Sequence, residues 1–267
     1  MKKLILASAI ASAFAGQVAY AADAAPAPAA TPDHVVAINV GVVTDYRYRG
    51  ISQTVKRPAL NATLDYTHNP TGLYAGAFAS TIKWIDDAQN AAGVSGSAPL
   101  EIDLYAGKRG EIGGGFTYDA GGIFYYYPNN KYGATGPALN SDYTNANTAE
   151  AYGQVGYGPA YFKYSYALTD LFGNANTVGS YYLDASVNQE ITDGYVLNLH
   201  YGYQHMANIS LGTYKDWKIG VTKDYGFAIA SIAYIDTTAK SAFYYKASDA
   251  SVLTGAGATV FSLSKNF

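Results

Sequence analysis

Residues 195–205 read YVLNLHYGYQH, and this stretch decides the fold class of the chain. Aromatic or aliphatic side chains at positions 195, 197, 199, 201 and 203 alternate with Val196, Asn198, His200, Gly202 and Gln204. A period of two places successive side chains on opposite faces of an extended strand. One face of this strand is therefore apolar, and the other is mostly polar.

The same alternation recurs along the chain and predicts twelve strands. They are expected near residues 35–49, 58–67, 73–84, 100–108, 114–127, 149–157, 160–168, 180–190, 195–204, 213–224, 226–235 and 258–267. After the first 33 residues, no run of 18 apolar residues offers a membrane helix. Segments of about ten residues with alternating polarity are instead typical of a transmembrane β-barrel, whose bacterial forms have an even number of strands.

The lengths of the connections favour the same fold. After every second strand the connection is short and rich in turn formers, at residues 68–72, 109–113, 158–159, 192–194 and 224–226. The connections near 85–99, 128–148, 169–179, 205–212 and 236–257 are longer, and among the outward ones only 50–57 is short. Short periplasmic turns that alternate with long external loops predict an all-β, antiparallel, up-and-down transmembrane barrel with about twelve strands.

The first 33 residues are expected to lie outside the barrel. Lys2 and Lys3 precede an apolar stretch, and Ala19-Tyr20-Ala21 has the small-x-small pattern of a signal-peptide cleavage site. We therefore predict a signal peptide at 1–21, an Ala/Pro-rich periplasmic tether at 22–33 and an outer-membrane barrel at 34–267.

Composition excludes several functional classes. The chain has no Cys and a formal net charge of -3, which argues against disulfide frameworks, cysteine zinc sites and nucleic-acid binding. It carries 27 Tyr and 28 Gly, and Tyr suits the pleated surfaces of strands. We expect aromatic girdles near the two membrane interfaces. The periplasmic one includes Tyr66, Tyr74 and Tyr161, and the external one includes Tyr46, Tyr48, Trp84, Tyr125, Tyr126, Tyr214, Trp217 and Tyr234.

Five quoted segments carry a family resemblance. VTDYRYRGISQT at 43–54, GFTYDAGGIFYYYP at 115–128, AEAYGQVGYGPAYFKYSYALTD at 149–170, DWKIGVTKDYG at 216–226 and VFSLSKNF at 260–267 occur in order along the chain. Together they resemble the TorF-type porin family of Gram-negative bacteria. The resemblance implies an outer-membrane β-barrel of porin type.

The last strand resembles the signal by which barrel proteins are recognised for outer-membrane assembly. Phe267 is terminal, and Phe261 and Leu263 lie on its face of the strand, with Lys265 as the polar exception. We therefore expect the barrel-assembly machinery, outer-membrane lipid and lipopolysaccharide as partners, and the cell outer membrane as the location.

Charged residues on the predicted inward face are the candidate functional residues, because charges at membrane depth face water or one another. The candidate pore-lining residues are Asp45, Arg47, Arg49, Asp65, Glu101, Asp103, Asp119, Glu150, Lys163, Asp184, Glu190, His200, Asp216 and Lys218. They predict a channel for passive diffusion of small hydrophilic solutes or ions.

The main alternative is a structural or surface-interaction barrel with a plugged lumen, in which Arg47 and Arg49 pair with nearby acids and fill the interior. A lipid-acting barrel enzyme is a further alternative, but we expect no enzyme, because neither a cofactor motif nor a serine, base and orienting group in clear spacing is found. Cofactors and metals are therefore not expected, and a monomer is favoured over a trimer.

Overall fold

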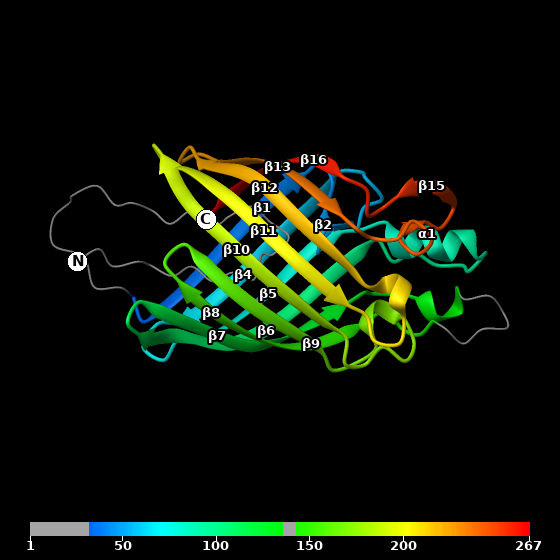
Figure 1. The fold of residues 1–267 in the computed structure, drawn as a ribbon, viewed down its shortest axis with the longest axis horizontal. Coiled ribbons are helices and arrows are strands. Elements are labelled where there is room, and N and C mark those ends of the chain that lie inside the picture. Colours follow the sequence, from blue (N-terminus) through cyan, green and yellow to red (C-terminus); the bar gives the residue numbers. More distant parts are fainter. Residues whose placement is uncertain (1–31, 136–142) are drawn as a thin grey trace.

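The computed structural model describes residues 32–135 and 143–267, which form a closed barrel of antiparallel strands (Figure 1). The twelve barrel strands are β1 (His34–Val43), β4 (Ala59–His68), β5 (Leu73–Thr81), β6 (Leu100–Gly113), β7 (Phe116–Tyr126), β8 (Thr148–Tyr157), β9 (Ala160–Ala167), β10 (Tyr181–Thr192), β11 (Tyr195–His205), β12 (Tyr214–Asp224), β13 (Ile229–Thr237) and β16 (Ala258–Asn266). The predicted fold class is confirmed. The predicted signal peptide and nearly all of the predicted tether lie outside the described residues.

The barrel closes where its first and last strands meet. β1 pairs with β16 from Asn39 opposite Asn266 to Val43 opposite Ser262. The amide of Phe267 donates to the carbonyl of Ile38 at 2.9 Å, which extends this seam by one residue. Closure satisfies the backbone groups of both strands, and a barrel needs this because lipid offers no hydrogen bonds.

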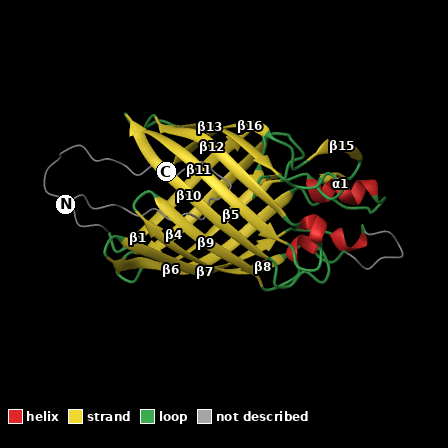
Figure 2. Cartoon of the chain, in the orientation of Figure 1, coloured by secondary structure: helices red, strands yellow, loops and turns green. Residues whose placement is uncertain are grey.

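Two ends of the barrel differ, as the loop lengths predicted. Short turns at 69–72, 114–115, 158–159, 193–194 and 225–228 lie at the end where β1 begins, which we call the turn end. The long connections lie at the other end, the loop end, where Figure 2 shows the helices gathered. They carry α1 (Trp84–Ala91), the single-turn helices η1 (Tyr132–Ala134), η2 (Leu171–Gly173) and η3 (Ser210–Gly212), and the hairpin of β14 (Tyr245–Lys246) and β15 (Asp249–Leu253).

Two local predictions were wrong. Residues 109–113 were predicted to turn, but β6 continues to Gly113 and the chain reverses at Gly114 and Gly115, which both have positive φ. Residues 85–99 were expected to be irregular, yet α1 occupies their first half and buries Ile85 completely. Eight residues span about two helical turns, which is too short to give a periodic signal. Within the described residues no helix is long and apolar enough to cross a membrane.

The outer face of the barrel is apolar, as expected for a lipid-facing surface. Alternate residues of each strand expose aliphatic side chains outward, including Val36 at 61 % and Leu60 at 62 % relative exposure. Their strand neighbours, such as Gly41 and Asn61, are buried toward the interior. A soluble protein rarely exposes a continuous apolar belt of this kind.

Tyrosine rings that lie on glycines fill part of the interior. Tyr105 of β6 covers Gly76 of β5, and Tyr182 of β10 covers Gly202 of β11, so closely that a Cβ on either glycine would overlap the ring or its hydroxyl. The same relation joins Tyr74 to Gly107 and Tyr152 to Gly121. The abundance of Tyr and Gly therefore reflects interior packing as well as strand preference.

The girdle prediction was wrong for several tyrosines. Tyr74, Tyr125 and Tyr214 are at most 5 % exposed and point inward, and Tyr161 points inward to Asp184. Trp84 belongs to α1 above the barrel wall. Tyr66, Tyr126, Tyr234 and Trp217, by contrast, are exposed on the outer face as predicted.

Candidate functional site

The first connection at the loop end folds into the barrel. β1 ends at Val43, six residues earlier than predicted, and residues 44–58 form an inserted loop that carries the short strands β2 (Arg47–Tyr48) and β3 (Ile51–Ser52). Arg49 and Gly50, with φ of 48° and 78°, form the two-residue turn between them. The alternation continues to residue 49 because β2 is also extended, although the chain has left the barrel wall.

The inserted loop is tied to itself and to the far wall by buried polar contacts. Asp45 accepts from Arg47 Nε at 2.7 Å and from Ser52 Oγ at 2.5 Å, which closes the base of the hairpin. Tyr46, only 1 % exposed, donates to Glu101 of β6 at 2.5 Å. Tyr48 is hydrogen-bonded to Tyr125 of β7. Tyr46 and Tyr48 were expected in the external aromatic girdle, and the inserted loop instead places them in the lumen.

Arg49 is the most heavily engaged of these residues. Its guanidinium donates to Glu150 of β8 at 2.7 Å and to Gln204 of β11 at 2.8 Å, and it lies 4.5 Å from the ring centroid of Tyr182 of β10. Its carbonyl accepts from the hydroxyl of Tyr214 of β12 at 2.8 Å. The hairpin tip therefore reaches four strands of the wall opposite β1 and narrows the lumen at the loop end.

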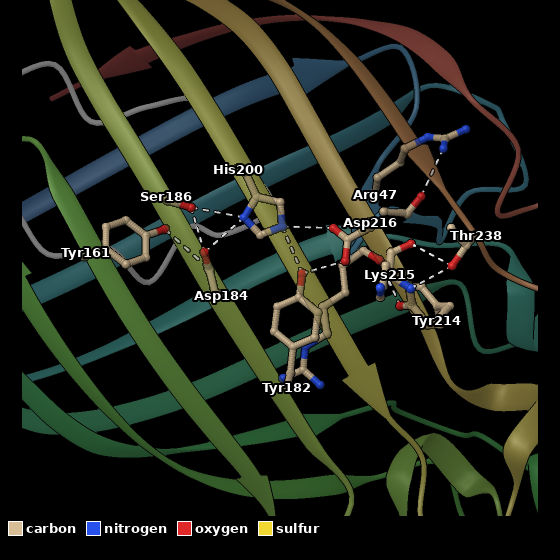
Figure 3. A network of polar contacts seen from close by, with 12 residues as sticks. Arg47, Tyr161, Tyr182, Asp184, Ser186, His200, Tyr214, Lys215, Asp216 and Thr238 are labelled. Carbon is tan, nitrogen blue, oxygen red and sulfur yellow. Dashed lines mark hydrogen bonds and ion pairs between the residues drawn. The ribbon is translucent and has the colours of Figure 1, made fainter.

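His200 lies at the centre of a second network, between Asp184 and Asp216 (Figure 3). On one side Nδ1 lies 3.0 Å from Asp184 Oδ1 and from Ser186 Oγ, and on the other Nε2 lies 2.9 Å from Asp216 Oδ2. Tyr182 donates to the second oxygen of Asp216 at 2.8 Å. Three adjacent strands, β10, β11 and β12, supply these groups. Asp184, His200 and Asp216 were predicted to face inward, but the sequence did not predict that they contact one another.

Serine, histidine and aspartate thus meet as they do in hydrolases, but the hydrogen bonds differ. Ser186 Oγ donates to Asp184 Oδ1 at 2.6 Å, so its proton is held by a carboxylate rather than by His200. Ser210 and His205, which lie close together in the sequence at the loop end, have no hydrogen bond between them among the described contacts. The network is a set of buried polar groups that are hydrogen-bonded across three strands.

The other predicted pore-lining residues lie on inward positions of the strands that form one side of the barrel. Asp65 accepts from Tyr105 at 2.6 Å, and Asp119 from Tyr74 at 2.5 Å. Asp103 is buried and has one carboxylate oxygen without a partner in the described residues. Glu190 is exposed at the turn end and accepts from the amide of Gly194. Lys163 lies over the ring of Tyr152, and Lys218 lies opposite His200 in the strand register.

Arg109 is an inward cation that was not predicted. Arg109 donates to Thr67 Oγ1 at 2.8 Å and its guanidinium lies 5.1 Å from the ring centroid of Tyr74. Residues 109–113 were predicted to form a turn, so Arg109 was not assigned to a strand face, whereas β6 includes it. The alternation of Glu101, Asp103 and Tyr105, carried four residues further, would have placed Arg109 inside.

Among the described residues, the opposite side of the interior carries no charge and has several small polar residues. In the described register, the inward positions of β13, β16 and β1 carry no charged side chain. Ser231 and Ser262 are half-buried there and hydrogen-bonded at 2.6 Å, and Asn39 donates to Asn266 at 2.7 Å. The lumen therefore has a charged wall and a small polar wall.

A cavity of about 430 Å³ lies at the loop end, above the inserted hairpin. Residues from the loop, α1, η1, η2, β12 and the segment 242–247 line it, and Arg49 and Gln204 lie among the lining residues. No group of three or more potential metal ligands occurs within the described residues.

A bacterial family of unknown function, Gcw_chp, matches residues 27–267 of the chain. The chain belongs to the Gcw_chp family. The match includes the whole barrel but assigns no function to it. The resemblance to the TorF-type family stays a prediction. No curated protein matches the sequence.

Solved outer-membrane structures are similar to this Gcw_chp barrel only at low identity. The KdgM porin is 6 % identical, with 86 % of this chain and 98 % of that one covered and a TM-score of 0.49. A TodX monoaromatic hydrocarbon channel mutant is 11 % identical, with coverage of 89 % and 91 % and a TM-score of 0.43. OmpT of Vibrio cholerae is 12 % identical, with coverage of 89 % and 98 % and a TM-score of 0.32.

Proposed function

We propose that the protein is an outer-membrane, porin-like channel for small hydrophilic solutes or ions, and that the inserted loop 44–58 sets its width. The observation that carries this proposal is the polarity of the closed barrel, which is apolar outside and charged or small and polar inside. A barrel of this kind is stable only in lipid, and its interior offers water and ions the polar contacts that lipid lacks.

The solute path in this proposal follows the neutral wall. At the turn end, inward residues of β1, β13 and β16 are uncharged, and the small residues Ala37, Ser231 and Ser262 among them keep part of their surface accessible. At the loop end the path passes the hairpin tip at Arg49. The charged wall opposite supplies a fixed field that acts on any ion in the path.

A plugged structural barrel is the second candidate, and a specific observation favours it. The hairpin makes buried hydrogen bonds with β6, β7, β8, β11 and β12, and a Cβ on Gly50 would lie 2.7 Å from Asp216 Cβ. A loop held at so many points leaves little room beside it. Catalysis is not part of either proposal, because Ser186 donates to Asp184 rather than to His200.

Two measurements on the same protein test the proposal. The mature chain is expected in the outer-membrane fraction, with heat-modifiable migration on gels, and recovery as a soluble periplasmic species would overturn both candidates. Refolded protein in planar bilayers is expected to give discrete conductance steps. A correctly folded, heat-modifiable barrel that gives no steps would exclude the open channel and support the plugged barrel.

A further inference from the structure

The cavity above the inserted hairpin is unusually rich in aromatic side chains. One group consists of Trp84, Tyr132 and Tyr143, with centroid distances of 5.0 Å and 4.9 Å between successive rings. The lining also includes Tyr214, Tyr244 and Phe243, again with successive centroids 5.0 Å and 4.9 Å apart. Edge-to-face or tilted contacts of this kind hold rings in place before any ligand arrives.

The deeper lining adds two more rings and a few polar groups. Tyr48 of the hairpin and Phe172 of η2 lie 5.7 Å apart in an edge-to-face contact. Arg49 and Gln204 also line the cavity and are hydrogen-bonded to each other at 2.8 Å. Pockets that are mostly apolar, with few polar groups and a volume of about 300–1,000 Å³, are typical small-molecule sites.

The lining charges nearly cancel one another. Among the described lining residues only Arg49, Asp87 and Lys246 are charged, and Arg49 is already paired with Glu150. Asp87 accepts two hydrogen bonds from Ser248 at the rim. Burial raises the pKa of Tyr132 and Tyr244, so both phenols stay neutral. The only fully buried lining charge, Arg49, is already paired, and the half-buried Asp87 and Lys246 have opposite signs, so a charged ligand would lose its hydration and meet no net countercharge from them.

We propose that this cavity binds an uncharged aromatic compound of one or two rings that carries a hydroxyl or similar polar group. An apolar protein cavity of about 150 Å³ holds benzene, so a volume of about 430 Å³ accommodates a larger ring system with its substituent. The Gln204 amide already donates to the carbonyls of Tyr181 and His205, so its Oε1 accepts from the ligand's hydroxyl, and the aromatic groups contact the ring. This inference goes beyond the proposed channel, because binding at the mouth requires no conduction.

The two tryptophans of the chain provide a direct test. Trp84 lines the cavity, whereas Trp217 is 40 % exposed on the outer wall. In the full-length mature protein in detergent, Trp217→Phe leaves Trp84 as the reporter, and Trp84→Phe leaves Trp217 as the matched control. 4-Nitrobenzyl alcohol, an uncharged quencher, is expected to quench Trp84 with a saturable curve and Trp217 only in linear proportion to its concentration.

Substitutions and competitors separate a specific site from general partitioning. Tyr244→Leu in the Trp217→Phe background is expected to weaken binding by about three- to tenfold, the effect of one aromatic contact. Tyr126→Leu, on the outer wall, is expected to leave it unchanged. Benzyl alcohol is expected to compete at lower concentration than cyclohexylmethanol, and 4-nitrobenzoate to bind more weakly than the alcohol.

Linear quenching of Trp84, or equal affinity in the Tyr244→Leu protein, would overturn the inference. Equal competition by cyclohexylmethanol would remove the aromatic preference, and tighter binding of 4-nitrobenzoate would show that a charge is recognised instead. The titrations are made at equilibrium in detergent. A negative result in these titrations would therefore concern only the binding site. Absence of conductance in bilayers would concern only the channel.

Discussion

Arg49 and Glu150 form an ion pair at 2.7 Å with both side chains at most 4 % exposed, and this pair joins the inserted loop to the far wall of the barrel. The two residues are 101 positions apart in the chain. Because neither charge meets solvent, each depends on the other for its stability. The pair is therefore the contact whose removal most directly tests whether the loop controls the lumen.

Replacing Arg49 by Gln is expected to release the hairpin tip and to raise single-channel conductance in planar bilayers. The change leaves Glu150 buried without its cation, and breaking a buried pair in this way costs about 3–5 kcal/mol. Arg57→Gln, at an exposed position of the same loop, is the matched control. Unchanged conductance in a folded Arg49→Gln protein would show that the hairpin is not the constriction.

Ion selectivity is expected to favour cations mildly. Nine of the predicted inward residues are acids, against the five bases Arg47, Arg49, Arg109, Lys163 and Lys218 when His200 is counted as neutral. A narrow tube of low dielectric constant focuses this imbalance on the permeating ion. Replacing Arg47 and Arg49 together by Gln is expected to shift the zero-current potential in a salt gradient further toward cations.

The control for this shift is Lys265→Gln, which removes a cation from the outward face of β16. The expected result is no change in the potential. If the double arginine variant conducts and its potential matches that of the native protein, the two arginines do not face the ion path.

Phe267 is expected to act in assembly rather than in packing. Its ring is 73 % exposed, while its amide and carbonyl are hydrogen-bonded to Ile38 across the seam. Phe267→Ala keeps those backbone bonds and is expected to lower the yield of barrel in the outer membrane nearly as much as deletion of the residue. Asn145→Ala, in an external loop, is the control, and equal yields of all three variants would make the C-terminal resemblance accidental.

Gly202→Ala is expected to destabilise the barrel, because the added Cβ would overlap the hydroxyl of Tyr182 and crowd Asp216 in the His200 network. Overpacking of this kind costs roughly 1–3 kcal/mol. The midpoint of urea unfolding, followed by the heat-modifiable band on gels, measures the loss.

Gly153→Ala on β8 is the matched control for this substitution. A Cβ added at Gly153 would meet no atom of the described residues within 4 Å, apart from those of its own chain neighbours. The alanine there is expected to leave the unfolding midpoint nearly unchanged. A loss equal to that of Gly202→Ala would refute the explanation by overpacking.

The twelve barrel strands were predictable because alternation is a local signal. In YVLNLHYGYQH the polarity of the side chains indicates their face of the strand, with Val196 as the exception, and β11 is observed at Tyr195–His205. The positions of the turns followed from Gly, Asn, Asp and Pro, whose backbone preferences are equally local. The inward orientation of Asp184, His200 and Asp216 followed from their alternate positions along the strands, without knowledge of their partners.

The sequence by itself thus determined the strand pattern, the closure into an even-numbered barrel and the polarity of its two faces, because each depends on neighbouring residues. Only the tertiary structure decided that Tyr46 and Tyr48 enter the lumen, and that Arg49 does so from an inserted loop rather than from the barrel wall. An extended hairpin and a wall strand have the same period of two, and the choice between them depends on partners such as Glu101 and Glu150 that lie far along the chain. The aromatic cavity at the loop end likewise exists only because separate loops meet there, and contacts between distant segments leave no periodic trace in a sequence.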